Sequence, residues 1–263
     1  MKYGIIGSGV MGGALARSIA VREGAQNVAV SNEPPEMAKR LADSLGCICA
    51  DNLTVAEKCE YVILAVKPNV VPAVIGQIAP ALKSRKDRFT IVSVAAGITV
   101  GMIKEMYGED ADVVRLMPNT PVSCGSGVIL CCSDTDHPEL WDALSGAGYV
   151  ERVSEKLLET AGTLTGCGPA FAFVIMQALA DGAVAVGSDR AHAEKFAALT
   201  LEGAARLALT SGEHFEALKD KVCSPGGSTI EGVAAMERNA VRSAMIEAVK
   251  ASYEKNLILG KKK

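Results

Sequence analysis

The chain has 263 residues, of which 49% are hydrophobic and 22% charged, and its formal net charge is −3. This length is sufficient for two domains with buried cores. No basic stripe occurs outside the Lys261–Lys263 tail, which argues against nucleic acid as a partner. The first apolar strand belongs to a motif and not to a targeting segment, so we predict a cytoplasmic protein that does not span a membrane.

The eight cysteines show no paired Cys-x-x-Cys spacing and no histidine partners at zinc-finger intervals. We interpret them as reduced, mostly small core residues, and expect neither a metal nor a disulfide.

A glycine-rich motif occupies the N-terminus, where Gly7, Gly9 and Gly12 follow a short strand and precede a helix expected over 14–21. In this pattern the first glycine permits a tight turn, the second lets a pyrophosphate approach the backbone, and the third allows the helix to pack closely on the strand. The helix directs unpaired N–H groups at the phosphates. A second strand, expected over 27–31, completes the βαβ unit, and the motif predicts a dinucleotide site.

The end of that second strand bears on the choice of cofactor. NAD-selective sites usually place a carboxylate there, which accepts hydrogen bonds from the adenosine ribose. Here Ser31 and Asn32 occupy the strand end, Glu33 is nearby and no arginine immediately follows. A 2′-phosphate would not be repelled, so we expect NADPH to be preferred, with NADH possible.

Alternating strands and helices follow along the chain. Strands are expected over 47–50, 60–66, 89–94, 112–117 and 127–131, and helices over 36–45, 53–58, 72–82, 99–107 and 137–145. This order predicts a doubly wound parallel sheet of the Rossmann type in a domain over residues 1–152. Ligands of such folds bind at the carboxyl ends of the strands, which here carry Gly9, Lys67, Pro68, Ala96 and Asn119.

Residues 153–263 are predicted to be almost entirely helical and form the second expected domain. We expect Pro169 at the first position of a long helix, where its missing N–H costs nothing. The stretch over 170–186 is apolar on nearly every face, but Gln177 and Asp181 interrupt it, which favours a buried helix over a membrane span. A domain of this size could hardly surround it, so we expect helices from a second subunit.

A second anion cradle is predicted at Ser224–Thr229, before a helix expected over 230–255. A Pro-Gly-Gly turn followed by Ser-Thr offers exposed N–H groups, a hydroxyl cap and a helix dipole end. Taken alone, the stretch would be interpreted by default as a plain helix cap with a tight entry turn.

Five segments, in this order and spacing, strongly resemble the pyrroline-5-carboxylate reductase family: Gly7–Gly12, Ala65–Pro68, Met117–Pro121, Gly166–Phe171 and Ser224–Ile230. The last is the most specific. The resemblance implies an N-terminal Rossmann domain and an all-helical C-terminal dimerisation domain. It also implies reduction of L-1-pyrroline-5-carboxylate to L-proline by NAD(P)H, in a homodimer or a larger ring of dimers.

The resemblance further implies roles for individual residues. Cofactor contacts are implied for Gly7, Ser8, Gly9, Val10, Met11, Ser31, Asn52, Ala65 and Lys67. The substrate would be held by Gly226, Gly227, Ser228 and Thr229, with Gly168, Pro169 and Ala170 lining its pocket. The Thr229 hydroxyl would hydrogen-bond the ring nitrogen as it becomes an amine, while the protein mainly orients and desolvates the reactants. Cys167 and Cys223 stand where the family more often has serine or threonine.

Two alternative functions stay open. β-Hydroxyacid dehydrogenases share this architecture and use a lysine on the first long helix of the second domain, but the helix expected over 170–186 has none. A non-catalytic dinucleotide sensor would have no use for a second anion cradle. His137 and His192 lack a chemical context, and we expect both at the surface.

Overall fold

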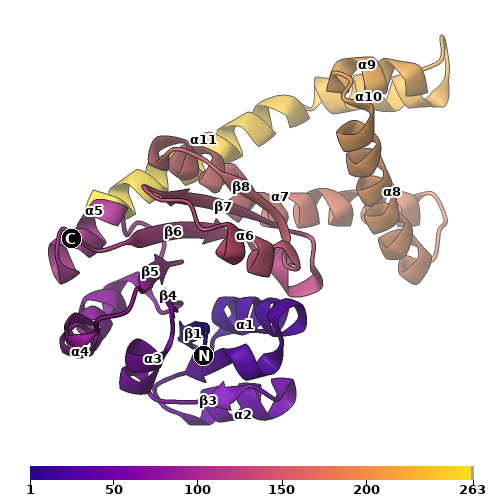
Figure 1. Cartoon of the computed structure of the whole chain (residues 1–263). Coiled ribbons are helices and arrows are strands. Elements are labelled where there is room, and N and C mark those ends of the chain that lie inside the picture. Colours follow the sequence, from indigo (N-terminus) through magenta and orange to yellow (C-terminus); the bar gives the residue numbers. More distant parts are fainter. Residues whose placement is uncertain (262–263) are drawn as a thin grey trace. The chain divides into compact units, whose positions relative to one another are not determined.

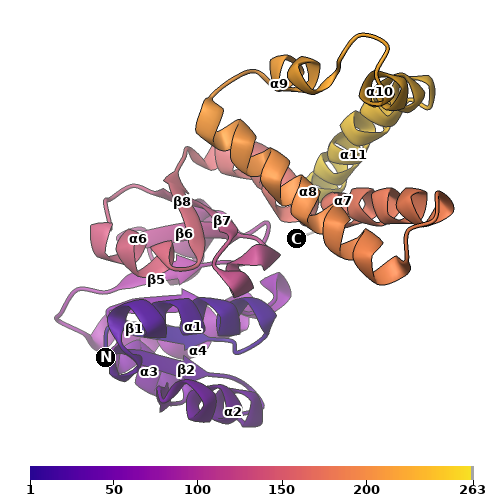
Figure 2. The same cartoon turned by 90° about the vertical axis from the view of Figure 1, so that its right-hand side faces the viewer.

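The computed structural model describes residues 1–261 and divides into two compact units (Figures 1 and 2). One unit is Met1–Gly166 together with the C-terminal residues from Lys255, and the other is Cys167–Glu254. The helices α7 (Glu155–Ala185) and α11 (Val241–Lys261) each contribute residues to both units.

Within the described residues, the first unit contains an eight-stranded sheet with the order β3-β2-β1-β4-β5-β6-β7-β8. Its strands are β1 (Tyr3–Ile6), β2 (Val28–Ser31), β3 (Ile48–Cys49), β4 (Tyr61–Leu64), β5 (Thr90–Ser93), β6 (Val113–Pro118), β7 (Gly127–Ser133) and β8 (Gly148–Arg152). Strands β1 to β6 are parallel, and β1, β2, β4 and β5 are buried throughout. Burial on both faces explains their nearly continuous apolar character.

The last two strands correct the expectation of a wholly parallel sheet. Strand β7 is antiparallel to β6, and β8, which the sequence reasoning missed, is parallel to β7. The connection over 119–126 contains only the short 3-10 helix η3 (Thr120–Cys124). A crossover between parallel strands needs about a dozen residues or more, so this short connection requires the chain to reverse direction.

Six helices cover the two faces of the sheet, as Figure 1 shows. One face packs on α1 (Val10–Glu23), α2 (Glu36–Leu45) and α6 (Pro138–Ser145), and the other on α3 (Asn52–Lys58), α4 (Val71–Ser84) and α5 (Val100–Tyr107). The 3-10 helices η1 (Ala25–Asn27) and η2 (Pro68–Val70) lie in the connections. The predicted Rossmann-like arrangement is therefore confirmed for this part of the chain.

The second unit is helical, as Figure 2 shows. Besides the parts of α7 and α11 it contains α8 (Arg190–Ser211), α9 (Phe215–Val222) and α10 (Ser228–Arg238). A small core joins Ala180 of α7 to Ala193 and Ala197 of α8. The single helix expected over 230–255 is wrong, because Asn239 caps α10 and Ala240 adopts a positive φ of 55° before α11 begins.

Helix α7 corrects the expectation for Pro169. It starts at Glu155 and continues through Pro169, which therefore lies inside the helix and not at its first position. By length and composition alone it could cross a membrane, yet only 6% of its most apolar 18-residue window is buried within the chain. The described residues therefore leave most of the apolar surface of this helix uncovered.

Candidate functional site

The three glycines of the N-terminal motif differ in what surrounds them. Gly7 has a φ of +108°, which favours glycine, and a Cβ there would meet the Ala65 carbonyl. At Gly12 a Cβ would overlap the Gly7 carbonyl oxygen, so the close approach of helix and strand requires glycine. A Cβ at Gly9 would have no atom within 4 Å. The backbone at Gly9, the N-cap of α1, is thus open on the side where a phosphate would approach.

The rest of the loop is tied to the end of β2. Ser8 donates its hydroxyl to the Ser31 carbonyl at 3.1 Å, and its backbone N–H donates to Asn32 Oδ1 at 2.9 Å. Gly7 N also donates to the Ser31 carbonyl at 2.8 Å. These bonds fix the glycine loop against the strand end, where Val10 is 84% exposed at the mouth of α1 and Met11 is half-buried.

Hydrogen-bonded polar side chains connect this strand end to α3 and α4. The Ser31 hydroxyl donates to Asn52 Oδ1, and Asn52 Nδ2 donates to Gln77 Oε1 at 2.7 Å. Ser31 is 2% exposed and Asn52 8% exposed, although both are polar. The sequence reasoning named Ser31 and Asn52 but missed Gln77, whose place in the amphipathic pattern of α4 marks it only as a surface residue.

The other predicted cofactor residues follow β4, β5 and β6. Ala65 and Lys67 come directly after β4, Pro68 opens η2, Ala96 follows β5 and Asn119 follows β6. Because these strands are parallel neighbours, their carboxyl ends share one edge of the sheet with the glycine loop. The structure therefore brings the predicted residues of this unit to a common edge. Lys67 and Ala96 are exposed there.

Asn119 differs from its neighbours at this edge because its side-chain amide is hydrogen-bonded to the backbone at both polar atoms. It is 7% exposed, its Oδ1 accepts from Val128 N at 2.8 Å, and its Nδ2 donates to the Thr165 carbonyl at 3.0 Å. Both ends of the amide are thus used to hold β7 and α7. This arrangement supports a positioning role for Asn119 at the edge.

The start of α7 is anchored by a charge cluster that the sequence reasoning missed. Arg115 of β6 is 3% exposed and pairs with Glu155 at 2.9 Å and Glu159 at 3.4 Å. Glu155 Oε1 also accepts from Val100 N at 2.9 Å. An arginine inside an otherwise apolar strand was the available signal, since a buried guanidinium requires a carboxylate partner.

The second predicted site lies in the helical unit, at the N-terminus of α10. Gly226 has a φ of +66°, and Gly227 is the N-cap, whose N–H donates to the Ser224 carbonyl at 3.0 Å. No side chain caps this helix, so the expected hydroxyl cap is wrong. The first N–H groups of α10, at Ser228 and Thr229, lie at an exposed helix end with its positive dipole.

The third predicted segment, Gly168–Ala170, lies within α7. Gly168 and Pro169 are half-buried and Ala170 is exposed. A Cβ at Gly168 would meet no atom of the described neighbouring residues within 4 Å. The segment is compatible with a pocket wall, but the described residues of its own unit do not close a pocket over it.

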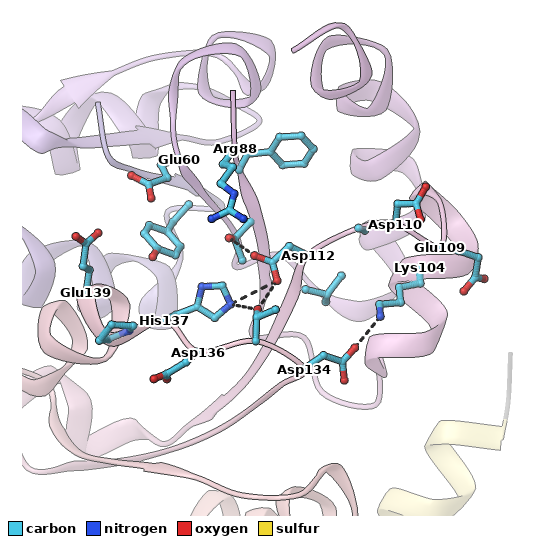
Figure 3. A pocket seen from close by; sticks show the side chains of 17 residues that line it. Glu60, Arg88, Lys104, Glu109, Asp110, Asp112, Asp134, Asp136, His137 and Glu139 are labelled. Carbon is cyan, nitrogen blue, oxygen red and sulfur yellow. Dashed lines mark hydrogen bonds and ion pairs between the residues drawn. The ribbon is translucent and has the colours of Figure 1, made fainter. Parts of the chain in front are cut away.

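A cavity of about 560 Å³ lies at the opposite, amino-terminal edge of the sheet, beside the first residues of β4, β5 and β6 (Figure 3). Seven of its 17 lining residues are Asp or Glu, and Lys104 pairs with Asp134 at 2.7 Å. None of the predicted site residues line this cavity. It is therefore distinct from the predicted cofactor edge.

His137 lines this cavity and is 6% exposed, so its expected surface position is wrong. Its Nε2 lies 2.9 Å from Thr135 Oγ1 and 3.5 Å from Asp112 Oδ1, and its ring meets Tyr61 and Trp141 edge-on. These contacts explain the residue as part of the packing. His192 is exposed at the N-terminus of α8, as expected.

All eight cysteines are free thiols. Burial raises the pKa of Cys59 to about 11 and that of Cys131 to about 12, which keeps both protonated at neutral pH. Cys167 and Cys223, beside the two predicted substrate segments, are half-buried, whereas Cys49 and Cys124 are exposed.

Two parts of the chain match models of known protein families. Residues 155–258 match the family model for pyrroline-5-carboxylate reductase dimerisation, and residues 2–97 match that for NADP oxidoreductase coenzyme F420-dependent. The pyrroline-5-carboxylate reductase of Synechocystis is 37% identical, with 100% of this chain and 99% of that protein covered. The Escherichia coli reductase is 35% identical, with 99% and 98% covered.

Solved structures agree over the same length. A pyrroline-5-carboxylate reductase of Coxiella burnetii aligns with a TM-score of 0.89 at 29% identity, covering 99% of this chain and 98% of that chain. The Plasmodium falciparum pyrroline carboxylate reductase, solved with NADP bound, aligns with a TM-score of 0.87 at 28% identity, with the same coverage. With sequence and fold matched from end to end, this chain belongs to the pyrroline-5-carboxylate reductase family.

Proposed function

We propose that this protein reduces the C=N bond of L-1-pyrroline-5-carboxylate with NAD(P)H and releases L-proline, the final step of proline biosynthesis. The observation that carries the proposal is the full-length match to reductases of this name at 35–37% identity. Each unit also contains a glycine-lined helix N-terminus, at Gly9 and at Gly227, suited to an anionic group.

We propose that the first unit binds the dinucleotide along the carboxyl edge of its sheet. The open backbone at Gly9 leaves space for the pyrophosphate, and Ser8, Val10 and Met11 frame the same helix end. Ser31 and Asn52 face the adenosine ribose, while Ala65, Lys67, Pro68, Ala96 and Asn119 border the remainder of the edge. When bound, the reduced nicotinamide supplies the hydride.

We propose that the substrate binds to the second unit. The N–H groups that follow Gly227 hold the substrate carboxylate, because an exposed helix N-terminus carries unpaired donors and a partial positive charge. The Thr229 hydroxyl hydrogen-bonds the ring nitrogen as it changes from imine to amine. Gly226, Ser224 and Ser228 shape the turn, and Gly168, Pro169 and Ala170 line the pocket.

We further propose that residues 1–152 provide the cofactor domain and residues 153–263 the substrate and dimerisation domain. A homodimer is the smallest assembly that we expect, since the dimerisation model matches residues 155–258 and the apolar surface of α7 is uncovered in one chain. The cytoplasm is the proposed location.

The decisive experiment monitors NADPH and NADH absorbance with and without pyrroline-5-carboxylate, and identifies proline in the product mixture. Saturable, substrate-dependent oxidation with proline formation is the expected result. Cofactor binding without turnover would instead support a dinucleotide sensor.

The same assay with β-hydroxyacids and NADP tests the competing dehydrogenase activity. Helix α7 starts earlier than expected and includes Lys156, exposed in its first turn, so this helix does carry a lysine. The full-length match to the reductases favours imine reduction.

A further inference from the structure

The hydrogen bonds that join Ser31, Asn52 and Gln77 run in one direction. The single proton of the Ser31 hydroxyl is donated to Asn52 Oδ1, and a proton of Asn52 Nδ2 is donated to Gln77 Oε1. In this direction the Ser31 oxygen has only lone pairs left for a ligand. A ribose 2′-hydroxyl can donate to such an oxygen, whereas a 2′-phosphate, itself an acceptor, cannot.

The same three side chains allow the opposite direction. If the amide of Asn52 turns over, its Nδ2 donates to Ser31 and its Oδ1 accepts from Nε2 of Gln77, with almost no change of shape. The Ser31 proton is then free to be donated to a 2′-phosphate. Only a residue that is both donor and acceptor at position 77 supports both directions, and glutamine has that property.

The backbone around Ser31 cannot make this adjustment instead. Its carbonyl accepts from Gly7 N at 2.8 Å and from Ser8 Oγ at 3.1 Å, which ties it to the glycine loop. The side chain of Asn32, the next residue, is also held in place. Its Oδ1 accepts from Ser8 N, and its Nδ2 donates to the Pro34 carbonyl at 2.9 Å. The side chains of Asn52 and Gln77 are thus the adjustable part of this strand end.

We propose that Gln77 is a positioning residue that sets the hydrogen-bond direction at Ser31. Because its amide can either donate or accept, the site can bind both NADH and NADPH. The inference rests on the proposed function, since it places the adenosine ribose at Ser31. Gln77 lies on the exposed side of α4 and acts through Asn52, without touching the cofactor itself.

Two substitutions fix the direction. The carboxylate introduced by Gln77→Glu accepts but does not donate, so it retains the observed direction and selects NADH. The ammonium group introduced by Gln77→Lys donates but does not accept, so it reverses the chain and selects NADPH. Loss of one hydrogen bond to a charged or buried group corresponds to about a tenfold change in dissociation constant. The ratio of the two constants should therefore move about tenfold in opposite directions.

The long-range effect of the charge added at position 77 must be distinguished from the effect of the hydrogen-bond direction. Ala73, exposed one turn earlier on α4, provides the matched variants Ala73→Glu and Ala73→Lys. Binding is measured by the fluorescence of NADH and NADPH without substrate, at low salt and at 0.5 M salt, where long-range charge effects extend over only about 4 Å. The ratios for the position 77 variants should survive high salt, and those for position 73 should return to the wild-type value.

Equal shifts at positions 73 and 77, or shifts at 77 that vanish in high salt, would overturn the inference. Unchanged ratios in both Gln77 variants, with binding intact, would do the same while leaving the proposed reductase activity in place. If neither cofactor binds to the wild-type protein, the proposed function itself fails. Turnover with both cofactors then checks that the binding preference carries over to kcat/KM.

Discussion

Asn119 Nδ2 donates to the carbonyl oxygen of Thr165 at 3.0 Å. Within a helix this carbonyl would accept from the N–H four residues later, but that residue is Pro169, which has no N–H. The loop after β6 thereby supplies the hydrogen bond that proline removes from α7. This explains how α7 continues through a Gly-Cys-Gly-Pro sequence that would ordinarily end a helix.

The substitution Asn119→Ala should lower the free energy of unfolding by about 2–4 kcal/mol, because it leaves the Thr165 carbonyl and the Val128 N–H without their partner. In a Pro169→Ala background the loss should be about 1 kcal/mol smaller, since the backbone N–H that this substitution restores can donate to the Thr165 carbonyl. Urea denaturation of the four proteins at one concentration measures the cycle. Equal losses in the two backgrounds would show that the two residues do not share this carbonyl.

Substitutions at two glycines of the N-terminal motif should have different effects, one on stability and the other on cofactor binding. Gly12→Ala forces a methyl group against the Gly7 carbonyl and should destabilise the protein by about 1–3 kcal/mol. Gly9→Ala meets no protein atom, so thermal unfolding should be unchanged while the dissociation constant for NADPH rises at least about tenfold. Calorimetry and cofactor fluorescence measure the two effects. Unaltered NADPH binding in Gly9→Ala would remove the pyrophosphate from that position.

Thr229 should act on turnover. Thr229→Ala should lower kcat/KM for pyrroline-5-carboxylate by about ten- to a few hundredfold, the scale of one well-placed hydrogen bond in a transition state, with folding intact. Thr229→Ser retains the hydroxyl and should recover most of the activity. Steady-state kinetics of the three proteins provide the test, and equal activities would exclude the hydroxyl from the reaction.

The uncovered surface of α7 should hold subunits together. Phe173 is 63% exposed in the single chain, so Phe173→Glu should shift the protein towards monomers by placing a charge in an apolar interface. Val21→Glu, at an 84% exposed apolar position of α1, is the matched control and should leave the assembly unchanged. Sedimentation velocity measures both. An unaltered assembly in Phe173→Glu would place the interface elsewhere.

Tyr61 should limit stability at alkaline pH. Burial, followed by the carboxylates of Glu60, Glu139 and Asp112, raises its pKa from 10 to about 12. Between these values the unfolded chain loses the phenol proton and the folded chain keeps it. The stability present below pH 10 therefore falls as the pH rises to about 12. In Tyr61→Phe this fall should be smaller than in the exposed control Tyr149→Phe, as measured by urea denaturation between about pH 9 and 11.

Local patterns predicted much of the first unit. The expected helix over 36–45 matches α2 to the residue, with Gly46 as its left-handed cap, because an amphipathic period and a glycine stop act within a few residues. The glycine motif likewise predicted which glycine meets the backbone and which remains open. The neighbouring carboxyl ends followed from the parallel order alone.

The errors arose where distant residues decide the outcome. Pro169 was expected to start a helix, because the hydrogen bond from Asn119 that allows it inside α7 joins positions far apart in the sequence. His137 was expected at the surface, but its packing depends on Tyr61 and Trp141 around it. Gln77 escaped notice because its contact with Asn52 is formed only when α3 and α4 lie side by side on the sheet.

The exposed apolar surface of α7 also bears on how a variant chain would assemble in a cell. A chain with a substitution in its glycine loop would keep the α7 surface intact and could still associate with wild-type chains. Mixed assemblies would then contain one intact glycine loop for each wild-type chain. A chain with a defect at Gly9 should therefore be found in the assembly, whereas a chain with a charge at Phe173 should be left out of it.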